Sequence, residues 1–403
     1  MRILYLCHRI PYPPNKGEKI RAFHQLQAIA ARHEVDLFTL TDRADDLVHQ
    51  SALAPYCQRI MVSKLNPRLS RLRALPFLLT RSPLTVPYFY SDELQREIRS
   101  AISQRSYDRI FVFCSAMAQY VDLAGGIPVV LDLVDVDSDK WAQYADSASF
   151  PFSAIYKREA HRLQDYERHI SEKAACVLVT TAREARLVRQ IAPAARVHVV
   201  PIGIDSKHFN EAADRPVASF PTIVFVGEMS YYPNEQAVLY FTRQVLPLIS
   251  DCVPGVRFLI VGRNPSSKVR KLQEIKGVEV TGSVPDVQPY LAQAQVSVAP
   301  FKIAAGLQTK ILEALASGLP VVATPIALQG LLPSVADVIN AGQSPEEMAK
   351  QIVFLLRDPQ LARRVGLEGQ RRVAAEYGWG PILEGFLRLI ENPGVAEEQT
   401  VPG

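Results

Sequence analysis

Residues 300–324 read PFKIAAGLQTKILEALASGLPVVAT. The apolar runs Val296 to Ala299, directly before this stretch, and Pro320 to Ala323, near its end, predict two buried strands. Between them, apolar residues recur at three and four positions, which predicts a helix over Thr309 to Ser317. Gly306 provides the turn from the first strand into that helix. A strand, a glycine turn, a helix and a second strand form one βαβ unit of a parallel sheet.

The same alternation of short β-branched runs and helical windows extends along the whole chain. It restarts after a loose stretch at 210–221, which predicts a second open sheet. The fold class is therefore α/β, with two Rossmann-like domains facing across a cleft. We expect domains at residues 1–203 and 204–379, with residues 380–403 forming a helix that returns to the first domain, plus a tail. The predicted strands are Arg2 to Cys7, Val35 to Leu40, Arg109 to Phe113, Pro128 to Leu133, Cys176 to Thr181, Val197 to Pro201, Thr222 to Val226, Arg257 to Val261, Val278 to Thr281, Val296 to Ala299 and Pro320 to Ala323.

The turn at Gly306 has the features of a phosphate site. Ligands of open α/β sheets bind where strands lead into helix N-termini, whose free N–H groups favour anions. Gly306 lets the amides of Leu307 and Gln308 face a phosphate, and Lys310 adds a positive charge. Glu313, one turn further on, is placed to accept both hydroxyls of a ribose. The alternative is a surface ion pair of Lys310 with Glu313.

Other loops at strand ends supply further binding residues. Gly17, in the turn after the first strand, permits close backbone approach to a diphosphate, and Lys19 adds charge there, although a plain structural turn explains Gly17 equally well. Arg263 follows Gly262 and offers a second positive charge. The loop at Ser283 and Val284 is the expected place for a nucleotide base.

Several stretches in the right order resemble one known family. The segment LEALASGLPVVA at 312–323 resembles the donor-binding signature of the family-four retaining glycosyltransferases, which have the GT-B fold. RHEV at 32–35, VPIGID at 200–205 followed by Phe209, and FVG at 225–227 agree with that pattern. LDLVDVDSDKW at 131–141 and YPN at 232–234 are similar to a bacterial subgroup of sugar transferases tied to exopolysaccharide assembly and exosortase systems.

The resemblance implies a function and a division of labour. The chain would move a sugar, with retention, from a nucleotide diphosphate sugar to a saccharide or lipid-linked saccharide. The second domain would bind the donor, the first would bind the acceptor, and Lys310 would stabilise the leaving diphosphate. A nucleotide-sugar epimerase of the same fold and a non-catalytic partner of polysaccharide assembly are the alternatives.

The chain also departs from the family pattern. Position 305 is Ala305 where relatives commonly carry the first of two glutamates, the second of which corresponds to Glu313. The histidine that many relatives place after the strand at 128–133 is absent. An acidic cluster of Asp132, Asp135, Asp137 and Asp139 stands there instead, and within it Asp135 is the predicted acceptor-orienting or base-like carboxylate.

The acidic cluster permits two other interpretations. Asp135 and Asp137 spell a D-x-D motif, by which glycosyltransferases of the other large architecture hold a divalent ion. That architecture would leave the second Rossmann-like half unexplained, so we expect no metal and no cofactor. Some of these aspartates can also cap the helix that contains Trp141.

Charge and composition limit location and partners. The 403 residues carry a net charge of +4 and include Cys7, Cys57, Cys114, Cys176 and Cys252, an odd and scattered set that favours a reducing compartment. No signal peptide is evident, and no apolar run reaches the roughly 20 residues of a membrane span. A Ser nucleophile elbow, a P-loop and a G-x-G-x-x-G fingerprint are absent, and we expect no nucleic-acid partner.

One stretch of the first domain is basic. No acidic residue occurs between Asp46 and Asp92, while arginines and a lysine alternate with leucines over residues 59–81. This basic amphipathic segment suits an anionic membrane surface or a phosphate-bearing acceptor. The alternative is a solvated helix face that covers the core. We therefore expect a cytoplasmic protein that can bind peripherally to the inner membrane face.

Overall fold

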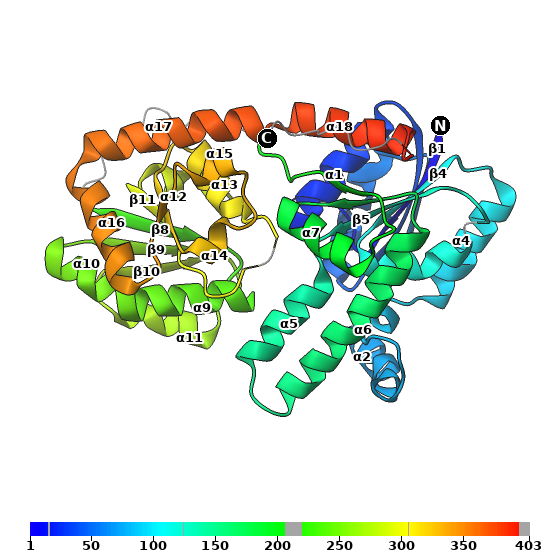
Figure 1. The fold of residues 1–403 in the computed structure, drawn as a ribbon, viewed down its shortest axis with the longest axis horizontal. Coiled ribbons are helices and arrows are strands. Elements are labelled where there is room, and N and C mark those ends of the chain that lie inside the picture. The colour runs from blue at the N-terminus through cyan, green and yellow to red at the C-terminus, as the bar shows by residue number, and fades with distance from the viewer. Residues whose placement is uncertain (15–16, 124, 206–219, 305, 395–403) are drawn as a thin grey trace. The chain divides into compact units, whose positions relative to one another are not determined.

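The computed structural model describes residues 1–14, 17–123, 125–205, 220–304 and 306–394. The chain forms two compact units, Met1–Ile202 with Gly380–Gly403, and Gly203–Trp379. Each unit is built on its own parallel sheet (Figure 1). The predicted α/β class with two Rossmann-like domains is confirmed.

The first unit contains a seven-stranded sheet of order β3-β2-β1-β4-β5-β6-β7. All its strand pairs are parallel, and helices cover both faces, so the strands are apolar on both sides. Its strands are β1 (Arg2–Cys7), β2 (Glu34–Thr41), β3 (Arg59–Lys64), β4 (Arg109–Phe113), β5 (Val129–Val134), β6 (Cys176–Val179) and β7 (Val197–Val199).

The helices of this unit follow the strands in alternation. Its α-helices are α1 (Gly17–Ala30), α2 (Pro67–Ala74), α3 (Thr85–Tyr88), α4 (Asp92–Gln104), α5 (Asp137–Ser147), α6 (Phe152–Lys173) and α7 (Ala182–Ile191), and its short 3₁₀ segments are η1 (Ala44–Tyr56), η2 (Leu75–Leu79) and η3 (Ser115–Leu123). Helix α18 (Trp379–Glu391) packs Phe386 and Ile390 into the core on one face of this sheet. Arg109 fixes its end by donating to the carbonyl oxygens of Ile390 and Glu391 at 3.2 and 3.0 Å.

The second unit contains a six-stranded sheet of order β10-β9-β8-β11-β12-β13. Its strands are β8 (Thr222–Val226), β9 (Arg257–Val261), β10 (Val278–Gly282), β11 (Val296–Ala299), β12 (Val321–Ala323) and β13 (Asn340–Ala341). Its helices are α9 (Tyr232–Tyr240), the π segment η4 (Phe241–Val245), α10 (Leu246–Cys252), α11 (Ser267–Arg270), η5 (Lys271–Glu274), α12 (Gln288–Ala292), α13 (Thr309–Ala316), α14 (Pro325–Leu328), α15 (Pro333–Ala336), α16 (Pro345–Arg357) and α17 (Pro359–Glu376).

The sequence pattern does not predict two of the strands. Residues 59–64 belong to the predicted basic segment, but they form the edge strand β3, where Arg59 pairs with Glu97 at 2.6 Å and lies over the Phe38 ring. Strand β13 has only two residues, too few for a hydrophobic period to show. None of the helices among the described residues is long and apolar enough to cross a membrane.

Candidate functional site

The carboxyl edge of the second sheet gathers the loops that are predicted to bind a ligand. Because β8, β9, β10, β11 and β12 are all parallel, the segments that follow them open at the same edge. These segments carry Glu228 after β8, Arg263 after β9, Ser283 after β10 and the Gly306 turn after β11. Residues about 80 positions apart in sequence thus share one surface.

The Gly306 turn has the conformation that its sequence predicts. Gly306 has a φ of 61°, a value that glycine adopts without steric cost, and α13 begins three residues later at Thr309. A second glycine, Gly330, packs against it so closely that a Cβ there would lie 2.3 Å from the Gly306 carbonyl oxygen. Sequence reasoning missed Gly330, because its role depends on a backbone contact across 24 residues. Position 305, where the family glutamate is absent, lies outside the described residues.

Lys310 lies in the first turn of α13 in a half-buried position. Its ammonium nitrogen donates to Gln308 Oε1 at 3.1 Å and lies 4.7 Å from the centroid of the Phe301 ring. Burial lowers the pKa of Lys310 to about 8, against the opposing effect of the Glu313 carboxylate. The side chain is therefore a desolvated cation at a helix N-terminus, a favourable place for an anion.

Glu313 is half-buried on the same side of α13. Burial raises its pKa, while Lys310 lowers it. The salt bridges found among the described residues do not include a pair of Lys310 with Glu313, so the alternative of a surface ion pair is not what the structure shows. Glu313 thus lies one turn after Lys310 on the helix that follows the Gly306 turn.

Arg263 is already paired in the structure, whereas the sequence pattern predicts a positive charge that is available to a ligand. Its Nε forms a short hydrogen bond with Glu228, whose other carboxylate oxygen accepts from Asn264 Nδ2 and Ser230 Oγ, both at 2.8 Å. Burial raises the pKa of Glu228, but the bonds from Asn264, Ser230 and Arg263 outweigh it and lower the pKa. Arg263 is thus neutralised by its own neighbour, and a ligand would have to compete with Glu228 for it.

Ser283 and Val284 lie in the loop after β10, next to Gly282 with a φ of 72°. Ser283 is exposed and Val284 is half-buried. Strand β10 is the edge strand of this sheet, so the loop stands at one end of the row of strand ends. The structure places both residues at the predicted edge.

The carboxyl edge of the first sheet is built differently. Gly17 opens α1, but the charges around it are already paired: Lys19 lies 3.2 Å from Asp46, and Glu18 lies 3.0 Å from Arg9 and 3.6 Å from His8. The prediction that Lys19 adds charge for a diphosphate is wrong, because this side chain is a buried structural cation.

The aspartates of the acidic cluster interact with different partners. Asp132 is fully buried and bound by Arg21 at 2.8 Å and Gln25 at 2.7 Å. Asp137 accepts from Ser115 Oγ at 2.9 Å. Asp139 pairs with Arg183 at 2.8 Å. In the part of the chain that the structure describes, no group of three His, Cys, Asp or Glu side chains is arranged to hold a metal ion.

Asp135 is held more loosely than the rest of this cluster. It is half-buried, and its carboxylate accepts a long hydrogen bond of 3.5 Å from Thr180. Burial raises its pKa, and Asp137 raises it further, against Lys140 and Arg21. The preceding Val134 has a φ of 67°, which is strained for a β-branched residue. The end of β5 therefore presents Asp135 on a fixed, strained turn.

Two buried acids hold the helix that follows Asp135. Glu184 accepts from the backbone N–H of Val136 at 2.6 Å, and Glu167 accepts from that of Ser138 at 3.1 Å. Burial raises the pKa of Glu184 to about 7 and that of Glu167 to about 8. These side chains cap α5 from outside, a task that the sequence interpretation gives to the aspartates themselves.

The basic segment presents its leucines to solvent. Leu69, Leu72, Leu75 and Leu79 are 63%, 60%, 54% and 95% exposed, so this face does not cover the core as the alternative proposed. Arg68 and Arg71 are exposed beside them, and Arg73 pairs with Asp92 at 3.5 Å.

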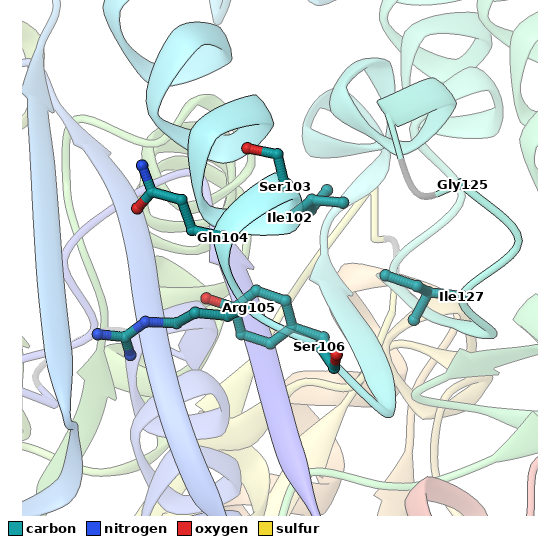
Figure 2. Close-up of a pocket in the computed structure, with 8 residues that line it drawn as sticks. Ile102, Ser103, Gln104, Arg105, Ser106, Gly125 and Ile127 are labelled. Atoms are coloured by element: carbon teal, nitrogen blue, oxygen red, sulfur yellow. The ribbon is translucent and has the colours of Figure 1, made fainter.

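A hollow of about 360 Å³ lies elsewhere, between the end of α4 and the loop before β5 (Figure 2). Its lining includes Ile102, Gln104 and Ile127 at the amino ends of the strands. Arg105 there pairs with the buried Asp36 at 3.0 Å. The hollow is therefore on the opposite edge of the sheet from Asp135, and its charge is already satisfied.

Comparison with protein-family models gives one match in each half of the chain. Residues 17–203 match the glycosyl transferase 4-like domain, and residues 220–358 match the glycosyl transferases group 1 domain. The first range ends one residue beyond Ile202, where the N-terminal segment of the first unit ends, and the second range lies inside the second unit.

Curated relatives are distant. The chain is 24% identical over 221 residues to a subunit of phosphatidylinositol N-acetylglucosaminyltransferase from Arabidopsis thaliana, over 52% of this chain and 47% of that protein. It is 25% identical over 257 residues to the MMP alpha-(1->4)-mannosyltransferase of Mycolicibacterium hassiacum, over 60% of this chain and 57% of that protein. The chain thus spans about half the length of the curated relatives it matches.

Solved structures match over nearly the whole chain. Anabaena Alr3699/HepE in complex with UDP superposes with a TM-score of 0.67 at 16% identity, over 97% of this chain and 100% of that one. A glycosyltransferase from Rickettsia africae ESF-5 gives a TM-score of 0.65 at 12% identity, over 97% of this chain and 98% of that one. The chain therefore has the two-domain GT-B fold, and its two parts match the models of a glycosyl transferase 4-like domain and of a group 1 glycosyl transferase domain.

Proposed function

We propose that this protein is a glycosyltransferase that moves a sugar from a nucleotide diphosphate sugar to a saccharide or lipid-linked saccharide. The observation that carries the proposal is Lys310, a desolvated cation with a pKa of about 8 at the N-terminus of α13, directly after the Gly306 turn. A diphosphate is the ligand that such a site favours. The UDP bound by Anabaena Alr3699/HepE, a protein of the same fold, supports this ligand class.

The donor is proposed to bind along the carboxyl edge of the second sheet. The diphosphate would contact Gly306, Leu307, Gln308 and Lys310, the ribose would bind Glu313, and the base would lie near Ser283 and Val284. Arg263 would bind the diphosphate only if its ion pair with Glu228 broke. No metal ion has a role in this proposal, because Lys310 and backbone amides supply the positive potential.

In the transfer step, the bond between the anomeric carbon and the diphosphate oxygen breaks and a bond to the acceptor hydroxyl oxygen forms. We propose retention of configuration, with Lys310 stabilising the charge that develops on the departing diphosphate. Asp135, with its raised pKa, would orient the acceptor hydroxyl and receive its proton. An Asp135→Asn variant should then lose turnover while it still binds the nucleotide; unchanged turnover would remove Asp135 from the mechanism.

The proposed setting is bacterial exopolysaccharide or cell-surface glycan synthesis on the cytoplasmic face of the membrane. The exposed Arg68 and Arg71 of the basic segment at 59–81 would bind anionic headgroups. Substituting Arg68, Arg71 and Arg73 by Ser should weaken binding to anionic vesicles at low salt. Unchanged vesicle binding in this variant would contradict an electrostatic contact through this segment.

The first test is thermal stabilisation by a panel of nucleoside diphosphates and nucleotide sugars, with and without EDTA. A ligand at a hundredfold excess over its Kd stabilises the folded state by about 2.7 kcal/mol. The shift should be insensitive to EDTA and absent in Lys310→Ala/Glu313→Ala. The matched control is Lys268→Ala/Glu235→Ala, which removes an ion pair of 3.9 Å in the same unit and should keep the shift.

Each other outcome selects a different function. A shift that requires a divalent ion would make this a metal-dependent site. The absence of any shift would favour a non-catalytic partner of polysaccharide assembly. Conversion of a nucleotide sugar without an acceptor would identify an epimerase.

A further inference from the structure

Helices α5 and α6 form a hairpin that projects from the sheet of the first unit (Figure 1). The connection at 148–151 reads ASFP and contains no charged residue. Phe150 in this connection is 84% exposed, and Phe152 at the start of α6 is 58% exposed. Two large apolar side chains therefore stand in water at the tip of one element. The nearest charged residues on the two helices are Asp146 and Lys157.

The hairpin is fixed to the segment that follows α2. Arg158 donates to the carbonyl oxygens of Phe77 and Thr80 at 2.5 and 2.6 Å. Glu159 accepts from the backbone N–H groups of Leu84 and Thr85 at 2.7 and 2.9 Å. These bonds hold the first turns of α6 against η2 and the segment that leads from η2 into α3.

Consequently, two apolar groups from distant parts of the sequence share one region of the surface. Phe152 precedes Arg158 by six residues, about 9 Å along a helix. Leu79, which is 95% exposed, directly precedes Thr80, whose carbonyl oxygen Arg158 binds. Leu79 therefore lies beside α6, about two helical turns behind the tip of the hairpin, and the exposed Arg68 and Arg71 belong to α2, which directly precedes η2.

A row of aromatic rings runs from the tip towards the sheet. The rings of Phe152 and Tyr156 are 6.2 Å apart, those of Tyr156 and Trp141 are 5.1 Å apart, and Tyr144 lies 5.8 Å from Trp141. All but Phe152 are half-buried. Tyrosine and tryptophan, with an apolar ring and a polar atom, are the side chains that suit the headgroup layer of a membrane.

We propose that the α5–α6 hairpin is a membrane-inserting element. Phe150 and Phe152 enter the acyl boundary of a lipid bilayer, and Trp141, Tyr144 and Tyr156 lie at headgroup depth. The neighbouring arginines fit a bilayer with anionic lipids. This contact differs from the electrostatic one above, because burial of phenylalanine does not weaken when salt screens charge.

The test is binding of the full chain to vesicles of phosphatidylcholine mixed with phosphatidylglycerol, measured by sedimentation at low and high salt without donor. Loss of each phenylalanine should weaken binding by roughly tenfold. Phe150→Ser/Phe152→Ser should therefore bind more weakly than the wild type at both salt concentrations. The matched control is Phe354→Ser/Leu367→Ser, which removes apolar side chains that are 58% and 51% exposed in the second unit and should bind like the wild type.

Binding of Phe150→Ser/Phe152→Ser equal to that of the wild type would overturn the proposal. The proposal would also be overturned if the wild type formed a larger assembly, the variant were a monomer and vesicle binding were unchanged. The tip would then contact a second copy of the chain. The Tm of the variant without ligand, which should equal that of the wild type, serves as the folding control. Because vesicle binding is measured without donor, it also separates this proposal from the proposed function, since donor binding can fail while vesicle binding persists.

Discussion

The carboxyl edges of the two sheets differ in how their charges are partnered. At the first edge, Arg21 binds Asp132, and Arg183 binds Asp139, both at 2.8 Å. At the second edge, Lys310 has a neutral amide and an aromatic ring as its closest partners, and its pKa is depressed by burial. Ion pairs such as those at the first edge hold the backbone in place. A desolvated charge with only neutral partners instead gains the most favourable interaction energy when an anion binds.

The largest effect is expected from breaking a buried pair at the first edge. Arg21→Met should lower the free energy of unfolding by about 3–5 kcal/mol, because it leaves the buried Asp132 without its counter-ion. Arg32→Met, which removes a surface pair of 2.6 Å with Glu384, should cost no more than about 1 kcal/mol. Urea unfolding measures both. Similar losses in the two variants would show that the first edge is not held by this pair.

At the second edge, Lys310→Met should act on binding rather than on stability. The affinity for a nucleoside diphosphate should fall roughly tenfold to hundredfold, because a charge-assisted bond is lost. Calorimetric titration gives the Kd, and Lys302→Met, an exposed lysine over the Tyr240 ring, is the control. Unchanged affinity in Lys310→Met would remove this side chain from the diphosphate site.

The depressed pKa of Lys310 adds a pH dependence to that affinity. Below a pH of about 8, the Lys310 side chain is charged before the ligand binds. Above that pH it is neutral, and ligand binding requires the uptake of a proton. The affinity should therefore fall as pH rises through this value. Lys310→Arg stays charged throughout and should bind with a flat profile over the same range. A flat profile in the wild type would mean that the ligand does not meet this ammonium group.

A smaller effect is expected from the contact that shapes the turn. In Gly330→Ala, the new Cβ would lie 2.3 Å from the Gly306 carbonyl oxygen, so the turn must shift. We expect a nucleotide affinity several-fold weaker, since overpacking costs about 1–3 kcal/mol. Gly385→Ala is the control because its Cβ would meet nothing within 4 Å. Equal nucleotide affinity in both variants would show that the phosphate site does not depend on the conformation of this turn.

The smallest effect concerns Arg263, a charge at the second edge that Glu228 already neutralises. Glu228→Gln keeps the shape of the side chain but removes the charge that neutralises Arg263. Arg263 should then be available to a diphosphate, and the Kd should fall a few-fold, as roughly expected for one partly exposed charge. A weaker affinity would instead make Glu228 a positioning residue for Arg263.

Local sequence was enough for most of the strands and for the main turn. The apolar runs predicted β1, β4, β8, β9 and β11 to the residue, because a strand buried on both faces is a continuous apolar run. Gly306 and the helix after it followed from glycine conformation and helical spacing. Strand β3 was missed because its basic residues at an exposed sheet edge resemble a solvated segment.

The partners of each charge were decided only by the tertiary structure. The aspartates at 132–139 are equivalent in sequence, but Asp132 is a buried counter-ion, whereas Asp135 accepts a long bond from Thr180. Arg263 was predicted from its place after a glycine, and its neutralisation depends on Glu228, which lies 35 positions earlier. Hydrophobic period and turn chemistry act over a few residues and are written in the sequence; burial and ion pairing depend on which loops the fold brings to the same edge.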